Sequence, residues 1–235
     1  MTKIAIDAGH GLYTPGKRCL KSLDDNETRE WRLNDRIADK LERMLKNRCE
    51  VLRVDDTTGA SDVSLADRVK KANNWGADFY ISIHHDAGIA GGSGGGTTVY
   101  YYSNAEARKT QARKLYDCVV GLTGLKGNRS NPVIKNGFYV IKNTKMAALL
   151  IENGFMDSKT DVPVILSESH AEKTAQGILN FLVSEFNLSG TAPAENNSGK
   201  LYKVQCGAFA NKANAEELKN KLKSAGYEAV IVYGG

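Results

Sequence analysis

Short apolar runs and longer amphipathic stretches alternate along the first 187 residues of the chain. Apolar runs rich in β-branched and aromatic residues predict strands. They lie at 3–6, 50–54, 78–85, 97–103, 137–143 and 147–155. Apolar residues spaced three or four apart predict helices over 30–45, 64–77, 104–124 and 167–187. Asn104 is the expected N-cap of the third helix, and Ser64 or Asp62 that of the second.

This alternation predicts an α/β fold in which helices flank a twisted, mostly parallel sheet. Ligands of such sheets gather at the carboxyl ends of the strands. Side chains with a chemical role should therefore lie just after the apolar runs.

The pattern changes beyond residue 187. Residues 188–200 lack apolar periodicity and are rich in Ser, Gly, Asn, Ala and Pro, which is typical of a linker. Residues 201–235 predict a small strand–helix–strand (βαβ) unit. Below about 40 residues a unit rarely folds alone, so we expect it to dock on another surface or to pair with a second copy in a homodimer.

Composition and charge narrow the range of partners. The 235-residue chain has 41% hydrophobic and 25% charged residues, as globular proteins do. Its net charge of +5 favours polyanions such as nucleic acid, anionic lipid or anionic wall polymers. However, no basic run resembles a nucleic-acid-binding arm, and no apolar run reaches the roughly 18 residues of a membrane span. We therefore expect neither nucleic acid nor a membrane as partner.

The cellular compartment is also predicted from the sequence. The apolar run of "MTKIAIDAGHG" is too short for a signal peptide. The four cysteines, Cys19, Cys49, Cys118 and Cys206, lack metal-binding spacing and are expected to be free thiols. We therefore expect synthesis and retention in the cytoplasm unless lysis or another protein releases the chain.

Polar side chains that suit a metal site follow several predicted strands. His10 follows the first strand, Glu30 begins the first helix, His84 or His85 ends the third strand, and Glu152 interrupts a late apolar run. Two histidines and one glutamate are a common zinc ligand set, and a second glutamate would serve as general base. Zinc lowers the pKa of bound water from about 15.7 to roughly 7. Each residue alone also has an ordinary structural explanation, such as a helix N-terminal carboxylate for Glu30.

The adjacent histidines are followed by a loop rich in glycine. Side chains alternate along a strand, so Ser82 and His84 share one face and His85 lies on the other. The loop 88–96 lacks the lysine–serine or lysine–threonine ending of a phosphate-binding loop. We expect it to form a flexible edge of a substrate groove.

At these residues the sequence resembles the zinc-dependent N-acetylmuramoyl-L-alanine amidases of the third amidase family. The matching segments are "IDAGHG", "EWRLNDRIADKL", "SLADRVKKANNWGADFYISIHHDAG" and "FYVIKNTKMAALLIENGFMDSKTD", in family order over residues 1–187. The resemblance implies that His10, Glu30 and His84 bind Zn²⁺ and that Glu152 is the catalytic carboxylate. It implies hydrolysis of the peptidoglycan amide between N-acetylmuramic acid and L-alanine, which causes lysis of the cell wall.

Two features leave alternatives open at the site. Glu27 competes with Glu30 as ligand, and Glu30 is favoured because it directly precedes the amphipathic helix in the family's register. The family commonly has His-x-Asn after the strand, whereas this chain has His84-His85-Asp86. How this turn contacts substrate is left open.

The C-terminal residues 201–235 resemble the first half of a SPOR domain, which binds peptidoglycan glycan strands. The whole layout resembles autolysins that lyse the mother cell late in sporulation, while phage endolysins share the catalytic domain, and the sequence does not separate them. The wall would be reached after release by lysis or by a holin. Two rival functions are a non-catalytic peptidoglycan-binding protein and a zinc peptidase or deacetylase; the set of His10, Glu30, His84 and Glu152 favours an enzyme.

Overall fold

The structure is a computed structural model that describes residues 1–190, 206–224 and 229–232. The chain divides into two compact units, Met1–Ala194 and Glu195–Gly235, which are described separately.

The first unit is built on a six-stranded sheet in the order β2-β1-β3-β6-β4-β5. The strands are β1 (Lys3–Ala8), β2 (Glu50–Arg53), β3 (Phe79–Asp86), β4 (Thr97–Tyr101), β5 (Val133–Lys135) and β6 (Ala147–Phe155). All neighbouring strands run parallel except β4 and β6, which are antiparallel. The predicted mostly parallel α/β sheet is confirmed.

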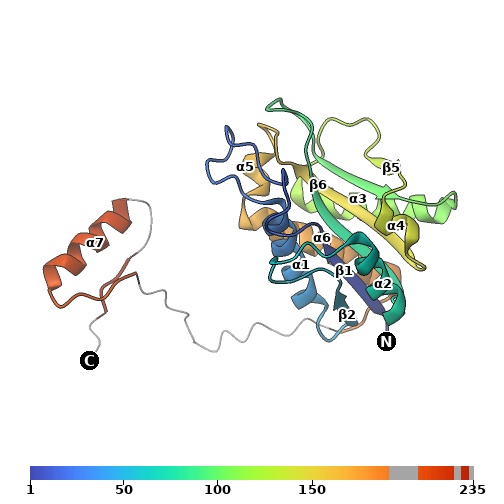
Figure 1. The fold of residues 1–235 in the computed structure, drawn as a ribbon, viewed down its shortest axis with the longest axis horizontal. Helices are drawn as coiled ribbons and strands as arrows, with labels where there is room; N and C mark the ends of the chain where they lie inside the picture. Colours follow the sequence, from blue (N-terminus) through green and yellow to red (C-terminus); the bar gives the residue numbers. More distant parts are fainter. Residues whose placement is uncertain (191–205, 225–228, 233–235) are drawn as a thin grey trace. The chain divides into compact units, whose positions relative to one another are not determined.

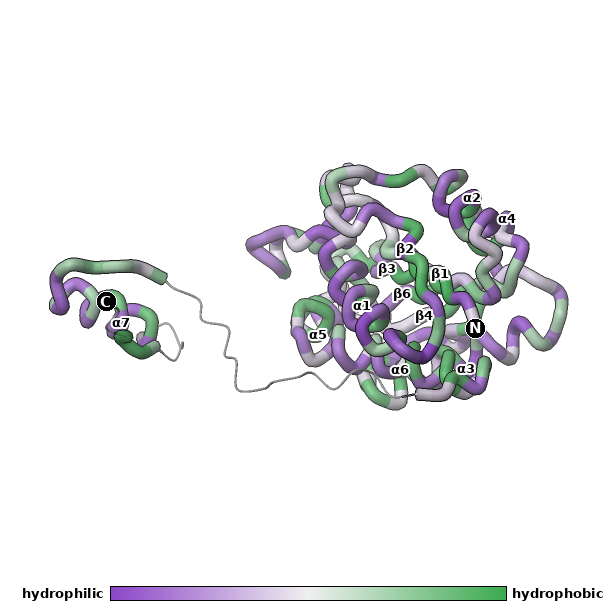
Figure 2. The backbone as a smooth tube through the Cα atoms, turned by 90° about the horizontal axis from the view of Figure 1, so that it is seen from below, coloured by the Kyte–Doolittle hydropathy of each residue, from purple (hydrophilic) through white to green (hydrophobic). Residues whose placement is uncertain are grey.

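Helices cover both faces of this sheet (Figure 1). They are α1 (Glu30–Leu45), α2 (Leu65–Trp75), α3 (Glu106–Thr123), α4 (Tyr139–Asn143), α5 (Val162–Ile165) and α6 (Glu168–Phe186). One core contains apolar residues of α1, α3 and α6, and a second core, on the other face, contains those of α2 and α4. In Figure 2 the strands near the centre are green, whereas α1 and α2 carry long purple stretches. The two apolar faces of the sheet therefore drive the packing.

The strand predicted at 137–143 is wrong. This segment contains the short helix α4, and a strand that the sequence analysis missed, β5, precedes it. Val140 and Ile141 are buried in the core that α4 shares with α2. A short apolar run has no periodicity long enough to separate strand from helix, so only the packing against α2 decides between them.

The helix caps give a mixed result. The Ser64 hydroxyl accepts a hydrogen bond from the amide of Asp67, so Ser64 is the cap of α2. The prediction for Asn104 is wrong, because Ala105 is the residue before α3 and makes no side-chain cap. The Asn104 side chain instead accepts a hydrogen bond from Lys135, the last residue of β5.

Within the second unit, the described residues contain the helix α7 (Lys212–Ser224). This confirms the helix of the predicted βαβ unit. Residues 206–209 and 229–232 carry no strand in the described structure, and the remainder of both predicted strands lies outside the described residues. The predicted linker likewise lies outside them from residue 191 onward.

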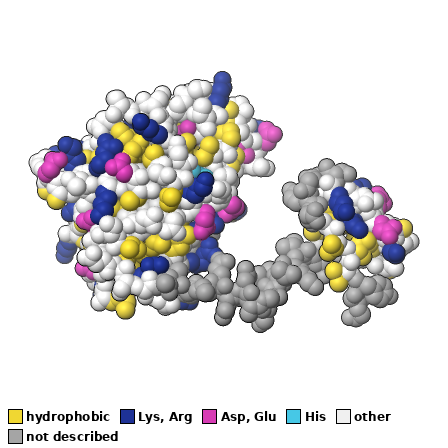
Figure 3. Space-filling model, turned by 180° about the vertical axis from the view of Figure 1, so that it is seen from behind, with side chains coloured by type: hydrophobic (Ala, Val, Ile, Leu, Met, Phe, Trp, Pro, Cys, Tyr) yellow, Lys and Arg dark blue, Asp and Glu magenta, His cyan; other side chains and the backbone are white. Residues whose placement is uncertain are grey.

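The structure also tests the predictions made from charge, cysteines and hydropathy. On the face of the first unit drawn in Figure 3, basic side chains are scattered among acidic and uncharged ones, so the positive charge is not concentrated there. Cys19, Cys49, Cys118 and Cys206 are all free thiols, as expected. In the described part of the chain, no helix is both long and apolar enough to span a membrane.

Candidate metal centre and active site

His84 and Glu152 lie side by side at the carboxyl ends of neighbouring strands. β3 and β6 are parallel, and His84 pairs directly with Glu152 in their register. Tyr80, four residues before His84, and Leu150, two residues before Glu152, both belong to the core shared with α2 and α4. Since side chains alternate along a strand, both site residues point to that same face.

His10 is placed by a tight turn after β1. Its backbone has a φ of 68°, in the left-handed region. Arg68, on α2, is 1% exposed and donates hydrogen bonds to the carbonyl oxygens of Ala8 (2.7 Å) and His10 (2.8 Å). A Cβ on Gly9 would lie 2.0 Å from Cε1 of His84, so only glycine allows this turn to approach the histidine.

Asp7 secures Arg68 beneath the turn. The two side chains form a buried ion pair, and the hydroxyls of Tyr80 and Ser82 donate to Asp7 over 2.8 and 2.7 Å. Burial alone would raise the pKa of Asp7, but the Arg68 charge and these hydrogen bonds hold it below its ordinary value. The paired guanidinium therefore stays available to bind the carbonyl groups around His10.

Glu30 enters from the first turn of α1 and faces both histidines. Its Oε1 lies 3.0 Å from Nδ1 of His84, and its Oε2 lies 3.3 Å from Nε2 of His10. One ligand atom from each of His10, Glu30 and His84 falls within 4.8 Å of the others. The structure thus brings the three predicted ligands together, with Glu152 beside them.

The two carboxyl groups have pKa values shifted in opposite directions. Burial disfavours ionised Glu30, yet hydrogen bonds from His10 and His84 hold the pKa of Glu30 well below its ordinary value. Burial, together with the negative charges of Glu30 and Asp86, raises the pKa of Glu152 well above its ordinary value. A pair of glutamates with opposite pKa shifts is what a ligand carboxylate and an acid–base group require.

The donor atoms fit a divalent cation. Oε2 of Glu152 is buried without a hydrogen-bond partner, whereas Oε2 of Glu30 is met at 3.3 Å by Nε2 of His10 and at 3.5 Å by Nζ of Lys17. Buried carboxylate oxygens without partners are costly unless a cation compensates them. Two histidines and one glutamate match a catalytic zinc ligand set, which leaves one position for water.

The alternatives Glu27 and His85 lie elsewhere. Oε1 of Glu27 forms an ion pair with Nε of Arg18 (2.8 Å), and Glu27 is outside the metal cluster found in the described residues. His85 is 2% exposed on the opposite face of β3, where its Nδ1 lies 2.8 Å from Oδ1 of Asn34. Burial lowers the pKa of His85 to about 3, which keeps its ring neutral.

The glycine loop 88–96 is held by side chains from the segment after β6. Oδ2 of Asp157 accepts hydrogen bonds from the backbone amides of Gly88, Ile89 and Ala90. Oδ2 of Asp161 accepts one from Gly96 at the other end. These hydrogen bonds anchor both ends of the loop, and its role as a flexible edge of a substrate groove stays a prediction.

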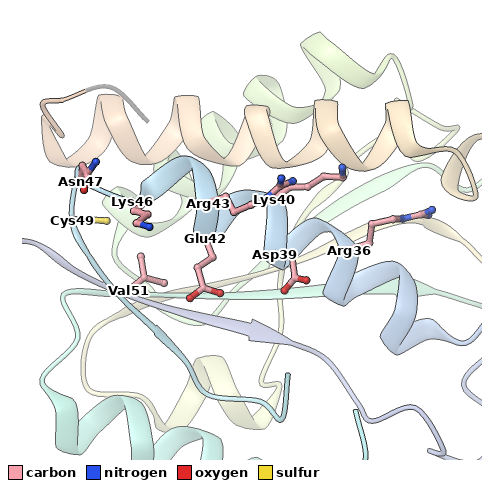
Figure 4. A pocket seen from close by; sticks show the side chains of 9 residues that line it. All are labelled: Arg36, Asp39, Lys40, Glu42, Arg43, Lys46, Asn47, Cys49 and Val51. Carbon is pink, nitrogen blue, oxygen red and sulfur yellow. The ribbon is translucent and has the colours of Figure 1, made fainter. Parts of the chain in front are cut away.

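One hollow of the first unit lies away from the predicted site residues. It measures about 700 Å³ and is lined by α1, the turn after it and β2 (Figure 4). Its residues are Arg36, Asp39, Lys40, Glu42, Arg43, Lys46, Asn47, Cys49 and Val51. Arg36 and Lys40 form ion pairs with Glu168 of α6, so these charges join two helices.

The sequence analysis missed Asn34 and Arg68 as supporting residues. Asn34 donates to the Gly9 carbonyl (3.2 Å) and binds His85, which fixes the turn to the third strand. Its spacing of four from Glu30 on a helix was an available signal. Nothing in the local sequence distinguishes Arg68 from a surface arginine, because the partners that bury it, Asp7, Ala8 and His10, lie on β1 and the following turn. Its other partners, Asp62 and Val63, lie just before α2.

Comparison with known proteins decides the family. The family model described as N-acetylmuramoyl-L-alanine amidase matches residues 4–184. The chain belongs to the N-acetylmuramoyl-L-alanine amidase family. A SPOR domain model matches residues 198–235 of the same amidase.

Two relatives are similar to this chain over most of its length. The amidase is 35% identical over 233 residues to the sporulation-specific N-acetylmuramoyl-L-alanine amidase of Bacillus subtilis strain 168. The aligned region covers 99% of this chain and 85% of that protein. It is 31% identical over 200 residues to an endolysin of Bacillus phage SPP1, covering 82% of this chain and 71% of that one.

A solved structure shares the fold of the catalytic unit. It is the catalytic domain of CwlV, an N-acetylmuramoyl-L-alanine amidase from Bacillus (Paenibacillus) polymyxa var. colistinus. It superposes with a TM-score of 0.70 at 27% identity, over 80% of this chain and all of that domain. The prediction of an amidase that hydrolyses peptidoglycan is confirmed, rather than that of a non-catalytic binder.

Proposed function

We propose that the amidase binds one Zn²⁺ through His10, Glu30 and His84 and uses Glu152 as its general base and acid. The bond cleaved is the amide between the lactyl group of N-acetylmuramic acid and L-alanine. The observation that carries the proposal is the cluster of these three ligand atoms within 4.8 Å of one another.

The metal ligands and Glu152 have separate roles in the proposed reaction. Zinc bound there would lower the pKa of a water molecule and polarise the scissile carbonyl. Glu152 accepts the proton of the attacking water, whose oxygen bonds to the carbonyl carbon. The same carboxyl group then donates that proton to the L-alanine nitrogen as the carbon–nitrogen bond breaks. A raised pKa suits Glu152 to hold the proton between these steps.

Treatment of purified cell walls with the full-length protein tests this function. We expect about one zinc per chain, from the three-ligand argument, and release of L-alanine amino termini at a rate that a chelator abolishes and zinc restores. New reducing sugars without new amino termini would mean a glycosidase. New amino termini on amino acids other than L-alanine would mean a peptidase, and release of acetate with free sugar amines would mean a deacetylase.

We further propose that the C-terminal unit binds glycan strands and pairs with a second copy. The support is its match to a SPOR domain model and its exposed apolar residues: Val230 is 81% exposed and Val232 is 65% exposed. Such residues favour an additional contact. Action at the cell wall follows from the family, while release by lysis or a holin stays a prediction.

Sedimentation of the full chain and of a chain ending at residue 190 tests the pairing. The full chain should sediment as a dimer and the shortened chain as a monomer, because the apolar surface is removed with the C-terminal unit. A monomeric full-length chain at high micromolar concentration would contradict the homodimer.

A further inference from the structure

Arg129 contacts two strand residues, Asp86 and Phe155, that follow the proposed reaction centre on β3 and β6. β3 and β6 continue past the pair His84 and Glu152, and Asp86 then pairs with Phe155. Nη2 of Arg129 lies 3.4 Å from Oδ2 of Asp86, and its guanidinium carbon lies 5.3 Å from the ring centroid of Phe155. Two residues along a strand correspond to about 7 Å. Asp86, the partner of Arg129, therefore lies about one such step past His84 along β3, where the register with β6 shifts.

The surroundings of Arg129 form a hollow of about 370 Å³. It is lined by the glycine loop, Asn128, Arg129 and Phe155. Among the described residues that line it, only Arg129 is charged. The loop amides of Gly88, Ile89 and Ala90 are already bound to Asp157, so Arg129 supplies the positive charge of this hollow.

The contacts of Arg129 leave room for a ligand. Its side chain is 35% exposed, and its hydrogen bond to Asp86 is long at 3.4 Å. A guanidinium has five N–H donors in a fork that matches a carboxylate. The Phe155 ring packs against the guanidinium, with 5.3 Å between the guanidinium carbon and the ring centroid. A carboxylate ligand would therefore gain a better-aligned pair than Asp86 provides.

The substrate carries a carboxylate close to the scissile bond. In an extended peptide, the Cα of the residue after L-alanine lies about 6 Å from the scissile carbonyl carbon. In peptidoglycan this residue is a γ-linked D-glutamyl group, whose α-carboxyl group is either free or amidated. We propose that Arg129, positioned by Asp86 and Phe155, binds this α-carboxylate and makes the enzyme prefer the non-amidated stem peptide. This inference rests on the proposed function.

Asp86 thereby gains a role in this chain. It is the residue at which the sequence departs from the family's His-x-Asn pattern. An aspartate there pairs with Arg129 through charge, as asparagine would not. The departure and the arginine together form one substrate-positioning unit.

The test uses linear peptidoglycan polymerised in vitro from precursors that differ only in carrying the free α-carboxylate or the α-carboxamide. The zinc-loaded full chain should show a kcat/KM about tenfold higher on the carboxylate form, as a charged hydrogen bond warrants. Arg129→Gln should remove this preference, mainly through KM on the carboxylate form. Arg129→Lys should keep part of it, because an ammonium is a point charge without a fork.

Arg113→Gln is the matched control. Arg113 lies on α3, packs 5.2 Å from the Tyr116 ring and pairs with Asp117, so it has the same kinds of partners away from the site. It should keep the full preference. Equal wild-type rates on both polymers, or equal losses on both in Arg129→Gln, would overturn the role of Arg129 while leaving the amidase function intact. Hydrolysis of neither polymer by the wild type would contradict the proposed function itself, and the inference with it.

Discussion

Glu152→Gln should lower kcat about a thousandfold, within the 10²- to 10⁴-fold range of general acid–base catalysis, with little change in KM. Glutamine keeps the shape of the side chain but neither accepts nor returns the proton. Oε2 of Glu152 is buried and has no hydrogen-bond partner. Burial disfavours the ionised form of this carboxyl group, so an uncharged amide in its place does not weaken the fold. The variant should therefore unfold at the same temperature as the wild type or above it.

Release of L-alanine amino termini from cell walls measures this effect, with zinc content measured on the same sample. Glu168→Gln is the matched control, because Glu168 is an exposed carboxylate paired with Arg36 and Lys40 on the surface. It should keep full activity. A general base accelerates a reaction by at least about a hundredfold. If Glu152→Gln retained more than about a tenth of wild-type kcat, Glu152 would therefore not be the base.

Glu30→Gln should lower zinc affinity by more than about a hundredfold. Residues that only hydrogen-bond a metal ligand already change metal affinity by about 10- to 100-fold, so loss of a ligand itself should cost more. The amide also cannot supply the negative charge that His10 and His84 face at 3.3 and 3.0 Å. Calorimetric titration of the metal-free variant with zinc measures the loss directly, without reliance on turnover.

Glu27→Gln is the control for this experiment, since Glu27 was the rival ligand in the sequence. Its carboxylate binds Arg18 on the surface, so this variant should bind zinc as tightly as the wild type. Zinc loss in Glu27→Gln together with retention in Glu30→Gln would reverse the ligand assignment.

Strand periodicity predicts only part of the arrangement of His84 and His85. Alternation alone separated His84 from His85, and β3 indeed directs them to opposite faces. Alternation did not say which face carries the site. That choice came from the pairing of His84 with Glu152 and from the closeness of Glu30, which are contacts between elements far apart in the chain.

Local sequence is sufficient to predict the α/β class, most of the strands and helices and the set of candidate ligands, because hydrophobic periodicity and residue type are local properties. It did not separate α4 from a strand, because five residues packed against α2 hold no period of their own. It also missed the support by Arg68 and Asn34, the anchoring of the glycine loop by Asp157 and the contact of Arg129 with Asp86. Only the tertiary structure decided these, since each joins residues that are distant in sequence, and their geometry follows from the register of the sheet.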